Sequence, residues 1–199
     1  MIVKVCGMTQ AENIRGVDAL GVDLMGFIFY DPSPRCCREV PSYLPSKAER
    51  VGVFVNAPLE EIAARHAAFD FDYVQLHGSE SADFCRSVAS LGVKVIKALS
   101  AESPEDIARA QDYMDCDLLV FDTRTPLVGG SGKSFDWSLL DAYQGPVPFL
   151  LSGGIGPDSV EALRGFSHPL LAGYDLNSRF ETSPGVKDIE LIGDFLEKI

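Results

Sequence analysis

The sequence predicts an α/β protein, built as one single-domain (β/α)₈ barrel of near-minimal length over residues 1–199. Eight short β-type segments alternate with helix-type segments along the whole chain, and most of the eight are near-continuous apolar runs. Such runs are typical of parallel strands that are buried on both faces. Eight strand–helix units in about 200 residues fit the smallest barrels of this kind.

The expected strands are short and are rich in Val, Ile, Leu and Phe. They comprise residues 2–6, 24–29, 50–55, 73–76, 94–99, 117–121, 147–151 and 170–174. No linker, low-complexity segment or charge block divides the chain, which favours a single domain. The alternative is a doubly wound open sheet, which would need a topological switch point and usually has fewer strands.

The segments between the strands carry helix start signals. Thr9 precedes an amphipathic stretch with Glu12 three residues further on, which is the pattern of a capping box. Further start signals precede the later helices, at Pro58, Ser79 and Ser103-Pro104. The second and sixth crossovers are only weakly helical, so we expect these two units to be the least regular.

Charge and cysteine content restrict the class of protein. The formal net charge of −12 disfavours nucleic acid and anionic membrane as partners. The apolar runs are far shorter than the roughly 20 residues of a membrane-spanning helix, and no signal-peptide pattern precedes the first strand. The five cysteines form no CxxC pair and are odd in number, which favours reduced thiols. We therefore expect a cytoplasmic protein.

A thiol and a carboxylate close two of the predicted strands. Strand alternation in the first strand turns Lys4 and Cys6 towards the barrel interior and the two valines outwards. Asp122 closes the sixth strand, and the carboxyl ends of all strands share one rim. The two side chains are thus candidates for an acid/base pair. Cys6 as a small buried apolar residue and Asp122 as a loop cap remain the structural alternatives.

Glycine-rich loops follow two of the predicted strands, and a polar loop follows a third. After the sixth, Gly130 and Gly132 lie in a segment that allows close approach of backbone to a ligand, but its spacing is not that of a Walker motif. After the seventh come Gly153 and Gly154, and the eighth is followed by Asn177-Ser178. Barrels of this type commonly bind phosphate between their last two loops through backbone N–H groups. Ordinary turns are the alternative.

Two further polar side chains are expected at the same rim. Arg35 lies in a proline-restricted loop after the second strand, where its guanidinium is suited to bind a carboxylate through two hydrogen bonds. His77 ends the fourth strand, where it is either a substrate contact or a satisfied structural group. The spacing of His, Cys and Asp residues suggests no metal site.

The order of these motifs resembles one family across essentially the whole chain. KVCGMT, GFIFYDPSPR, RVGVFVN, VQLHG, DTRTPLVGGSGKSFDW, LSGGI and DLNSRFETSPGVKD are similar to segments of phosphoribosylanthranilate isomerases of tryptophan biosynthesis. The resemblance implies an enzyme with no metal or organic cofactor that rearranges N-(5-phosphoribosyl)anthranilate, a phosphorylated small molecule, to a 1-deoxyribulose 5-phosphate. A monomer or a homodimer is expected.

The resemblance also implies roles for individual residues. Cys6 corresponds to the family's base, Asp122 to its acid and Arg35 to the residue that meets the anthranilate carboxylate. The phosphate-binding positions correspond to Gly153, Gly154, Asn177 and Ser178, while His77, Gly130 and Gly132 are expected to contact the rest of the substrate. The chain departs from the family at Cys36 and Val128, where aromatic residues are frequent.

The chemistry sets conditions on the two catalytic candidates. The acid must be protonated when substrate arrives, so we expect burial to raise the pKa of Asp122 from its reference value of about 3.9. A thiol with the reference pKa of about 8.5 is only partly ionised at neutral pH. Two other functions remain open: a Schiff-base aldolase or lyase that uses Lys97, and a phosphate-binding barrel without activity.

Overall fold

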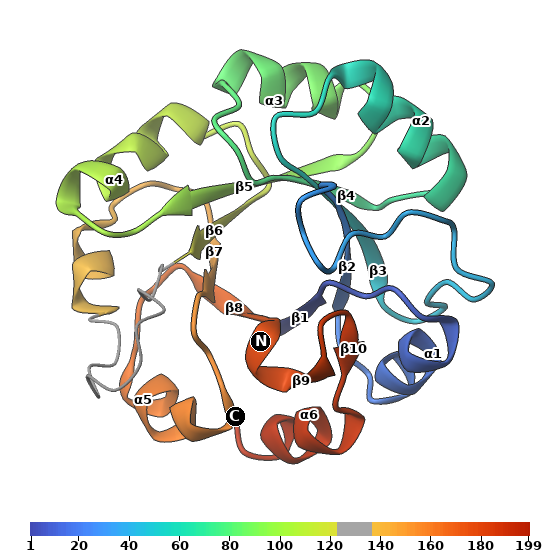
Figure 1. The fold of residues 1–199 in the computed structure, drawn as a ribbon. Helices are drawn as coiled ribbons and strands as arrows, with labels where there is room; N and C mark the ends of the chain where they lie inside the picture. The colour runs from blue at the N-terminus through green and yellow to red at the C-terminus, as the bar shows by residue number, and fades with distance from the viewer. Residues whose placement is uncertain (123–136) are drawn as a thin grey trace.

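A closed barrel of eight parallel strands forms the centre of the protein in a computed structural model that describes residues 1–122 and 137–199 (Figure 1). The strands are β1 (Ile2–Cys6), β2 (Leu24–Phe29), β3 (Glu49–Phe54), β4 (Tyr73–Leu76), β5 (Lys94–Ser100), β6 (Leu118–Asp122), β7 (Phe149–Ser152) and β8 (Leu171–Leu176). They pair in chain order, and β1 pairs with β8 to close the barrel. The predicted barrel is confirmed, and the open sheet is excluded.

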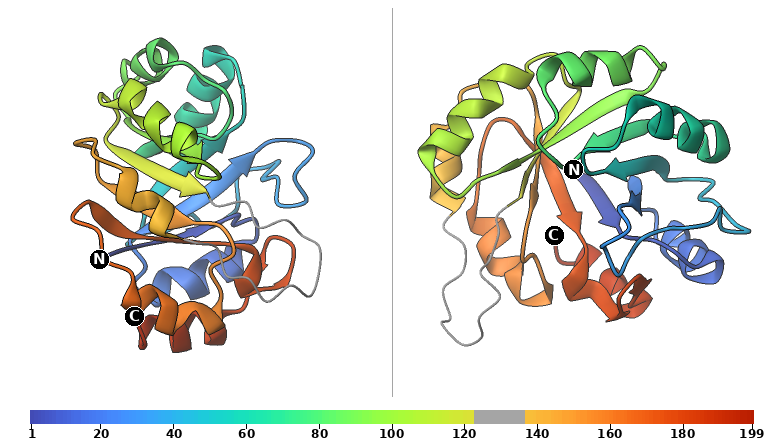
Figure 2. Two further views of the ribbon diagram at one scale, coloured as in Figure 1. Left: turned by 90° about the vertical axis from the view of Figure 1, so that its left-hand side faces the viewer. Right: turned by 45° about the horizontal axis from the view of Figure 1, so that its top comes forward.

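Helices cover the outside of the barrel (Figures 1 and 2). They are α1 (Ala11–Ala19), α2 (Leu59–Phe69), α3 (Ala82–Ala89), α4 (Pro104–Ala108), α5 (Val160–Gly165) and α6 (Ile189–Leu196), with 3₁₀ turns η1 (Arg109–Tyr113), η2 (Trp137–Ala142), η3 (Pro157–Ser159) and η4 (Ser178–Phe180). A short hairpin of β9 (Glu181–Ser183) and β10 (Val186–Lys187) follows β8. As expected, residues 30–48 contain no helix, and the described part of the sixth crossover contains only η2.

Two of the predicted helix starts are wrong in detail. The N-cap of α1 is Gln10, with no capping side chain, because the Thr9 hydroxyl donates instead to the Gly185 carbonyl at 2.8 Å. The N-cap of α3 is Ser81 and not Ser79; its hydroxyl accepts a hydrogen bond from the Phe84 amide. Ser103 caps α4 as predicted. Tertiary contacts at the rim of the barrel thus override one local capping pattern.

Apolar side chains form two layers, one between strands and helices and one inside the barrel. Val3 and Val5 belong to the outer layer, and Cys6 belongs to the inner one. The alternation predicted for β1 is therefore confirmed. The inner layer also contains residues from most other strands, namely Leu24, Val51, Val53, Ile96, Ala98, Leu118, Val120 and Leu150. This layer forms the floor beneath the carboxyl ends of the strands.

Asp18 fixes the irregular second crossover to α1. Its carboxylate is buried and accepts hydrogen bonds from the Tyr43 hydroxyl at 2.8 Å, from the Ser46 amide and hydroxyl, and from the amides of Lys47 and Ala48. Burial alone would raise the pKa of Asp18, but these donors lower it from 3.8 to about 2. One side chain thereby compensates for the missing helix of this unit.

We predict that Asp18→Asn lowers the free energy of unfolding by about 1–3 kcal/mol at pH 6, because an amide NH₂ would face backbone N–H donors. The folded-state pKa is depressed, so the wild-type advantage is complete above about pH 4 and is lost as the pH falls towards 2. Urea unfolding of both proteins between pH 2 and 7 measures this difference. An advantage that did not shrink at low pH would contradict the assignment.

Candidate functional site

A pocket of about 640 Å³ opens at the carboxyl ends of the strands. Eight of the ten predicted site residues line it, from six of the eight strands or the loops that follow them: Cys6, Arg35, His77, Asp122, Gly153, Gly154, Asn177 and Ser178. The other two, Gly130 and Gly132, lie outside the described residues, as does Val128. Cys36 lines a neighbouring pocket and not this one. Residues from both ends of the chain thus meet at one site.

Cys6 lies on the floor of this pocket beside two buried lysines. The Lys4 ammonium is completely buried and pairs with Asp175 at 2.8 Å. Burial raises the pKa of the Cys6 thiol, and the positive charges of Lys4 and Lys187 offset this only in part. The thiolate is therefore the minor form of Cys6 at neutral pH in the unliganded site.

Asp175 presents an unused acceptor to the pocket. Its Oδ2 accepts from Lys4, whereas its Oδ1 is buried and, among the described residues, has no hydrogen-bond partner. Since a buried acceptor without a partner costs free energy, this oxygen is suited to receive a ligand hydroxyl. Asp175 was not among the predicted site residues, because the eighth strand was expected to end at residue 174 and in fact extends to Leu176.

A bulge in β8 turns Asp175 inwards. Phe149 pairs with Leu171 and Leu150 with Gly173, so Ala172 is an extra residue opposite β7. Ala172 packs against the inner layer, whereas Tyr174 belongs to the outer one. Strict alternation would place both on the same side. Gly173 is required here, because a Cβ would lie 1.8 Å from the Ile2 carbonyl oxygen.

Asp122 and His77 form a hydrogen-bonded pair across the pocket. His77 Nε2 lies 3.2 Å from Asp122 Oδ2, and His77 Nδ1 lies 2.9 Å from Gln75 Nε2. The Gln75 Nε2 group is an amide donor, so Nδ1 accepts from it, and the neutral imidazole carries its proton on Nε2, which donates to Asp122 Oδ2. The Asp122 side chain is 29% exposed, so the burial that we expected for it is only partial.

Arg35 reaches the pocket from the loop after β2, as predicted. Its Nε and Nη2 groups donate to both oxygens of Glu181 at 2.7–3.0 Å. Gly7, with φ +82°, makes room for this side chain, because a Cβ there would lie 2.9 Å from Arg35 Cδ. The sequence analysis named Arg35 but missed Glu181, since an acidic residue in a hairpin carries no local signal.

The loops after β7 and β8 adjoin each other at one side of the pocket. Gly153 and Gly154 adopt φ values of +87° and +68°, which favour glycine. Asn177 and Ser178 line the pocket from the opposite loop. The guanidinium of Arg179 donates to both oxygens of Asp158 at 2.9 Å and so links η4 to η3. The structure thus brings the two loops that were predicted to bind phosphate to the same pocket.

Lys97, the residue of the Schiff-base alternative, lies in a different environment. Its ammonium is 1% exposed and donates to the Leu76 and Gly78 carbonyls and to Glu80, at 2.8–3.0 Å. An ammonium with all three protons engaged and a buried carboxylate beside it is a poor nucleophile. This geometry disfavours the alternative.

No group of three or more His, Cys, Asp or Glu side chains in the described part of the chain is placed to hold a metal ion. None of the helices in residues 1–122 and 137–199 is both long and apolar enough to cross a bilayer.

The closed barrel, with its polar pocket at the carboxyl ends of the strands, has the architecture of a (β/α)₈-barrel enzyme, since these barrels place their active sites there. The family model described as N-(5'-phosphoribosyl)anthranilate isomerase matches residues 3–198. The chain belongs to this family.

Individual relatives agree with this assignment. The N-(5'-phosphoribosyl)anthranilate isomerase of Parabacteroides distasonis is 45% identical, over all of this chain and 93% of its own length. The Thermotoga maritima enzyme, whose crystal structure is known, is 35% identical in sequence. Its structure matches with a TM-score of 0.83, over all of this chain and 98% of the Thermotoga maritima chain. A phosphoribosylanthranilate isomerase in complex with reduced 1-(o-carboxyphenylamino)-1-deoxyribulose 5-phosphate has a TM-score of 0.82 at 32% identity, with the same coverage.

We predict that the alkylation rate of Cys6 by iodoacetamide keeps rising above pH 9, because only the thiolate reacts and burial raises the pKa of this thiol. Quantifying the Cys6 peptide by mass spectrometry separates it from the other four cysteines. A rate that already reached its plateau near pH 7 would show that the two lysines outweigh burial.

Proposed function

We propose that this protein catalyses the Amadori rearrangement of N-(5-phosphoribosyl)anthranilate to 1-(2-carboxyphenylamino)-1-deoxyribulose 5-phosphate, a step of tryptophan biosynthesis. The observation that carries this proposal is that one pocket is lined by Cys6, Arg35 and Asp122 and by the loops after β7 and β8. Family membership over residues 3–198 supports it.

Asp122 acts as the general acid in the first step. Protonation of the ribose ring oxygen breaks the bond between that oxygen and C1, while the nitrogen lone pair forms a C=N double bond to C1. The resulting Asp122 carboxylate is stabilised by His77 Nε2 at 3.2 Å when that nitrogen carries the proton. The partial exposure of Asp122 gives it access to the substrate.

Cys6 acts as the general base in the second step. The protonated Schiff base makes the C2 proton acidic, and the thiolate of Cys6 removes it to give an enolamine, which tautomerises to the ketone. Lys4 and Lys187 favour the thiolate electrostatically. Asp175 Oδ1 is placed to accept a hydrogen bond from a ribose hydroxyl and so to hold the sugar over Cys6.

The two charged groups of the substrate are bound separately, and this orients it in the pocket. The phosphate binds between Gly153-Gly154 and Asn177-Ser178 through backbone N–H groups, and Arg35 binds the anthranilate carboxylate. Since catalysis needs C2 above Cys6 and the ring oxygen near Asp122, fixing both ends of the substrate sets the reacting geometry. No metal or organic cofactor takes part in these steps.

We also propose that the protein works in the cytoplasm, as a monomer or a homodimer. The five cysteines are free thiols in the structure, which suits a reducing compartment. One solved structure of the Thermotoga maritima relative is of mutually generated monomers of a dimeric phosphoribosylanthranilate isomerase. Gel filtration with light scattering measures the assembly of this chain directly.

We predict that Cys6→Ser and Asp122→Asn each lower kcat at least about 100-fold, since positioned proton transfer typically contributes 10²–10⁴-fold. The loss of substrate fluorescence during a single turnover measures the rate, and circular dichroism checks that both variants remain folded. If the serine variant kept most of its activity, Cys6 would not be the base. Trapping of a substrate adduct on Lys97 by borohydride would favour the lyase alternative instead.

We predict that Gly154→Asp strongly weakens the binding of phosphorylated ligands, because its carboxylate would occupy the phosphate position. Gly154→Asn is the matched control: it introduces the same shape at φ +68° without the charge. Titration with a phosphorylated product analogue measures affinity, and the two melting temperatures should agree closely. Equal affinity in both variants would place the phosphate elsewhere.

A further inference from the structure

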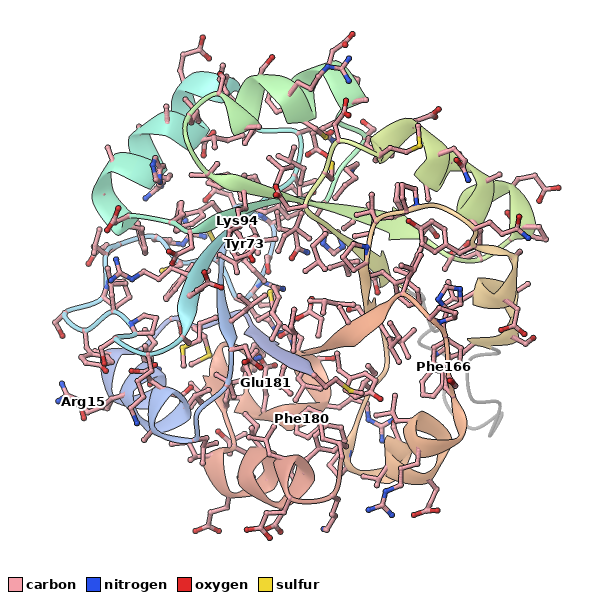
Figure 3. All side chains as sticks on the ribbon, turned by 180° about the vertical axis from the view of Figure 1, so that it is seen from behind. Arg15, Tyr73, Lys94, Phe166, Phe180 and Glu181 are labelled. Carbon is pink, nitrogen blue, oxygen red and sulfur yellow. The ribbon has the colours of Figure 1, made fainter. Side chains whose placement is uncertain are left out.

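Beneath the wall of the pocket lies a buried ion pair, of which the steps above use only the charge of Lys187 near Cys6 and give Glu181 no role. Glu181, which opens β9, and Lys187, which ends β10, approach within 2.6 Å, and their side chains are 4% and 0% exposed. Both belong to the hairpin after β8, which lies between α1 and α6 in Figure 1, and Figure 3 labels Glu181 there. Replacing such a pair by apolar groups is often neutral or stabilising, so stability alone does not account for it.

Glu181 is a fixed acceptor and not a mobile surface charge. Its Oε1 accepts from Lys187 at 2.6 Å and from the Gly185 amide at 3.1 Å, and both oxygens accept from Arg35. Burial by itself would raise the pKa of Glu181, but hydrogen bonds from Arg35 and Lys187 hold it below its ordinary value. The carboxylate therefore stays ionised and in place over the physiological pH range.

The contact with Glu181 determines which part of Arg35 is available to a ligand. A guanidinium has five N–H donors in one plane. Glu181 engages Nε and Nη2, so the fork between Nη1 and Nη2 is left, and none of the described residues accepts a hydrogen bond from Nη1. Because Arg35 lines the pocket, this second fork is the one that can pair with a planar carboxylate.

Lys187 connects the same pair to the phosphate side of the pocket. Its ammonium donates to the Asn177 side-chain oxygen at 2.8 Å and to the Asn177 carbonyl at 3.3 Å. The backbone of Lys187 is itself fixed by two hydrogen bonds with the Asn13 side chain, at 2.7 and 2.8 Å. Asn13 lies on α1, so the hairpin is attached to the rigid outer helix.

We propose that Glu181 and Lys187 are positioning residues for the proposed substrate: Glu181 orients Arg35 for the carboxylate, and Lys187 orients Asn177 at the phosphate. This inference rests on the proposed function. The hairpin after β8 would then hold Arg35 and Asn177, which bind the two charged groups of the substrate, at a fixed distance from each other. Glu181 has no part in the proton transfers, so its loss should affect binding more than chemistry, whereas loss of Lys187 also removes a positive charge that favours the Cys6 thiolate.

The test compares two ligands that differ only in the carboxylate. One is the reduced product analogue 1-(o-carboxyphenylamino)-1-deoxyribulose 5-phosphate, and the other is its counterpart made from aniline. Glu181→Gln should raise the Kd of the first about tenfold or more, as expected for a weakened charged hydrogen bond, and that of the second less than about twofold. KM should rise while kcat changes little. Equal weakening of both ligands would mean a merely structural role.

A double-mutant cycle shows whether Glu181 acts through Arg35. Arg35→Ala with Glu181→Gln should lose no more affinity for the carboxylate ligand than Arg35→Ala alone, because the residue to be oriented is already missing. Additive losses would overturn the proposal. Glu161→Gln, at the exposed pair with Arg164, is the matched control and should leave both affinities unchanged.

Lys187→Met extends the test to the phosphate side. It should weaken the binding of inorganic phosphate, whereas Glu181→Gln should not.

If Glu181→Gln alone fails to fold, the double variant Glu181→Gln/Lys187→Met removes both buried charges. The ratio of its Kd values for the ligands with and without the carboxylate then gives the same answer. An unchanged ratio would refute the inference. A wrong proposed function would be recognised from the wild-type protein alone: it would show no turnover and would bind the ligands with and without the carboxylate equally well.

Discussion

Pairing of β1 with β8 closes the barrel, and the geometry of the site depends on this contact. It places Lys4 opposite Asp175 and joins the first strand, which carries Cys6, to the strand that leads into Asn177. The close approach of the two strands requires the absence of a side chain at Gly173, whose Cβ would collide with the Ile2 carbonyl. Cys6 and the loop after β8 are adjacent because the two ends of the sheet meet.

Buried positive charges at the site allow a protein with a negative net charge to bind an anionic substrate. The chain carries a formal net charge of −12, yet Lys4, Arg35 and Lys187 surround Cys6 and the pocket. Asp175 and Glu181 hold these cations in place. Burial strengthens such interactions because there is little water to screen them. The local field at the site is therefore set by a few paired groups and not by the overall charge.

Much of the fold was predictable, because its signals are local. Apolar runs located all eight strands to within a few residues, and alternation in β1 correctly turned Cys6 inwards and Val3 outwards. The weak second crossover was also recognised. Thr9 shows the limit of local signals: its capping pattern is sound, but Gly185 offers its hydroxyl a partner that is 176 residues away in the sequence.

The sequence by itself determined the barrel, the family and the side chains at the strand ends, because each depends on residue order and on periodicity within a few residues. Only the tertiary structure decided what those side chains contact. Glu181 behind Arg35, Glu80 beside Lys97 and the inward turn of Asp175 arise from long-range pairing and from one bulge. A single extra residue in a strand reverses which face its side chains occupy, and no local pattern in the sequence reports it.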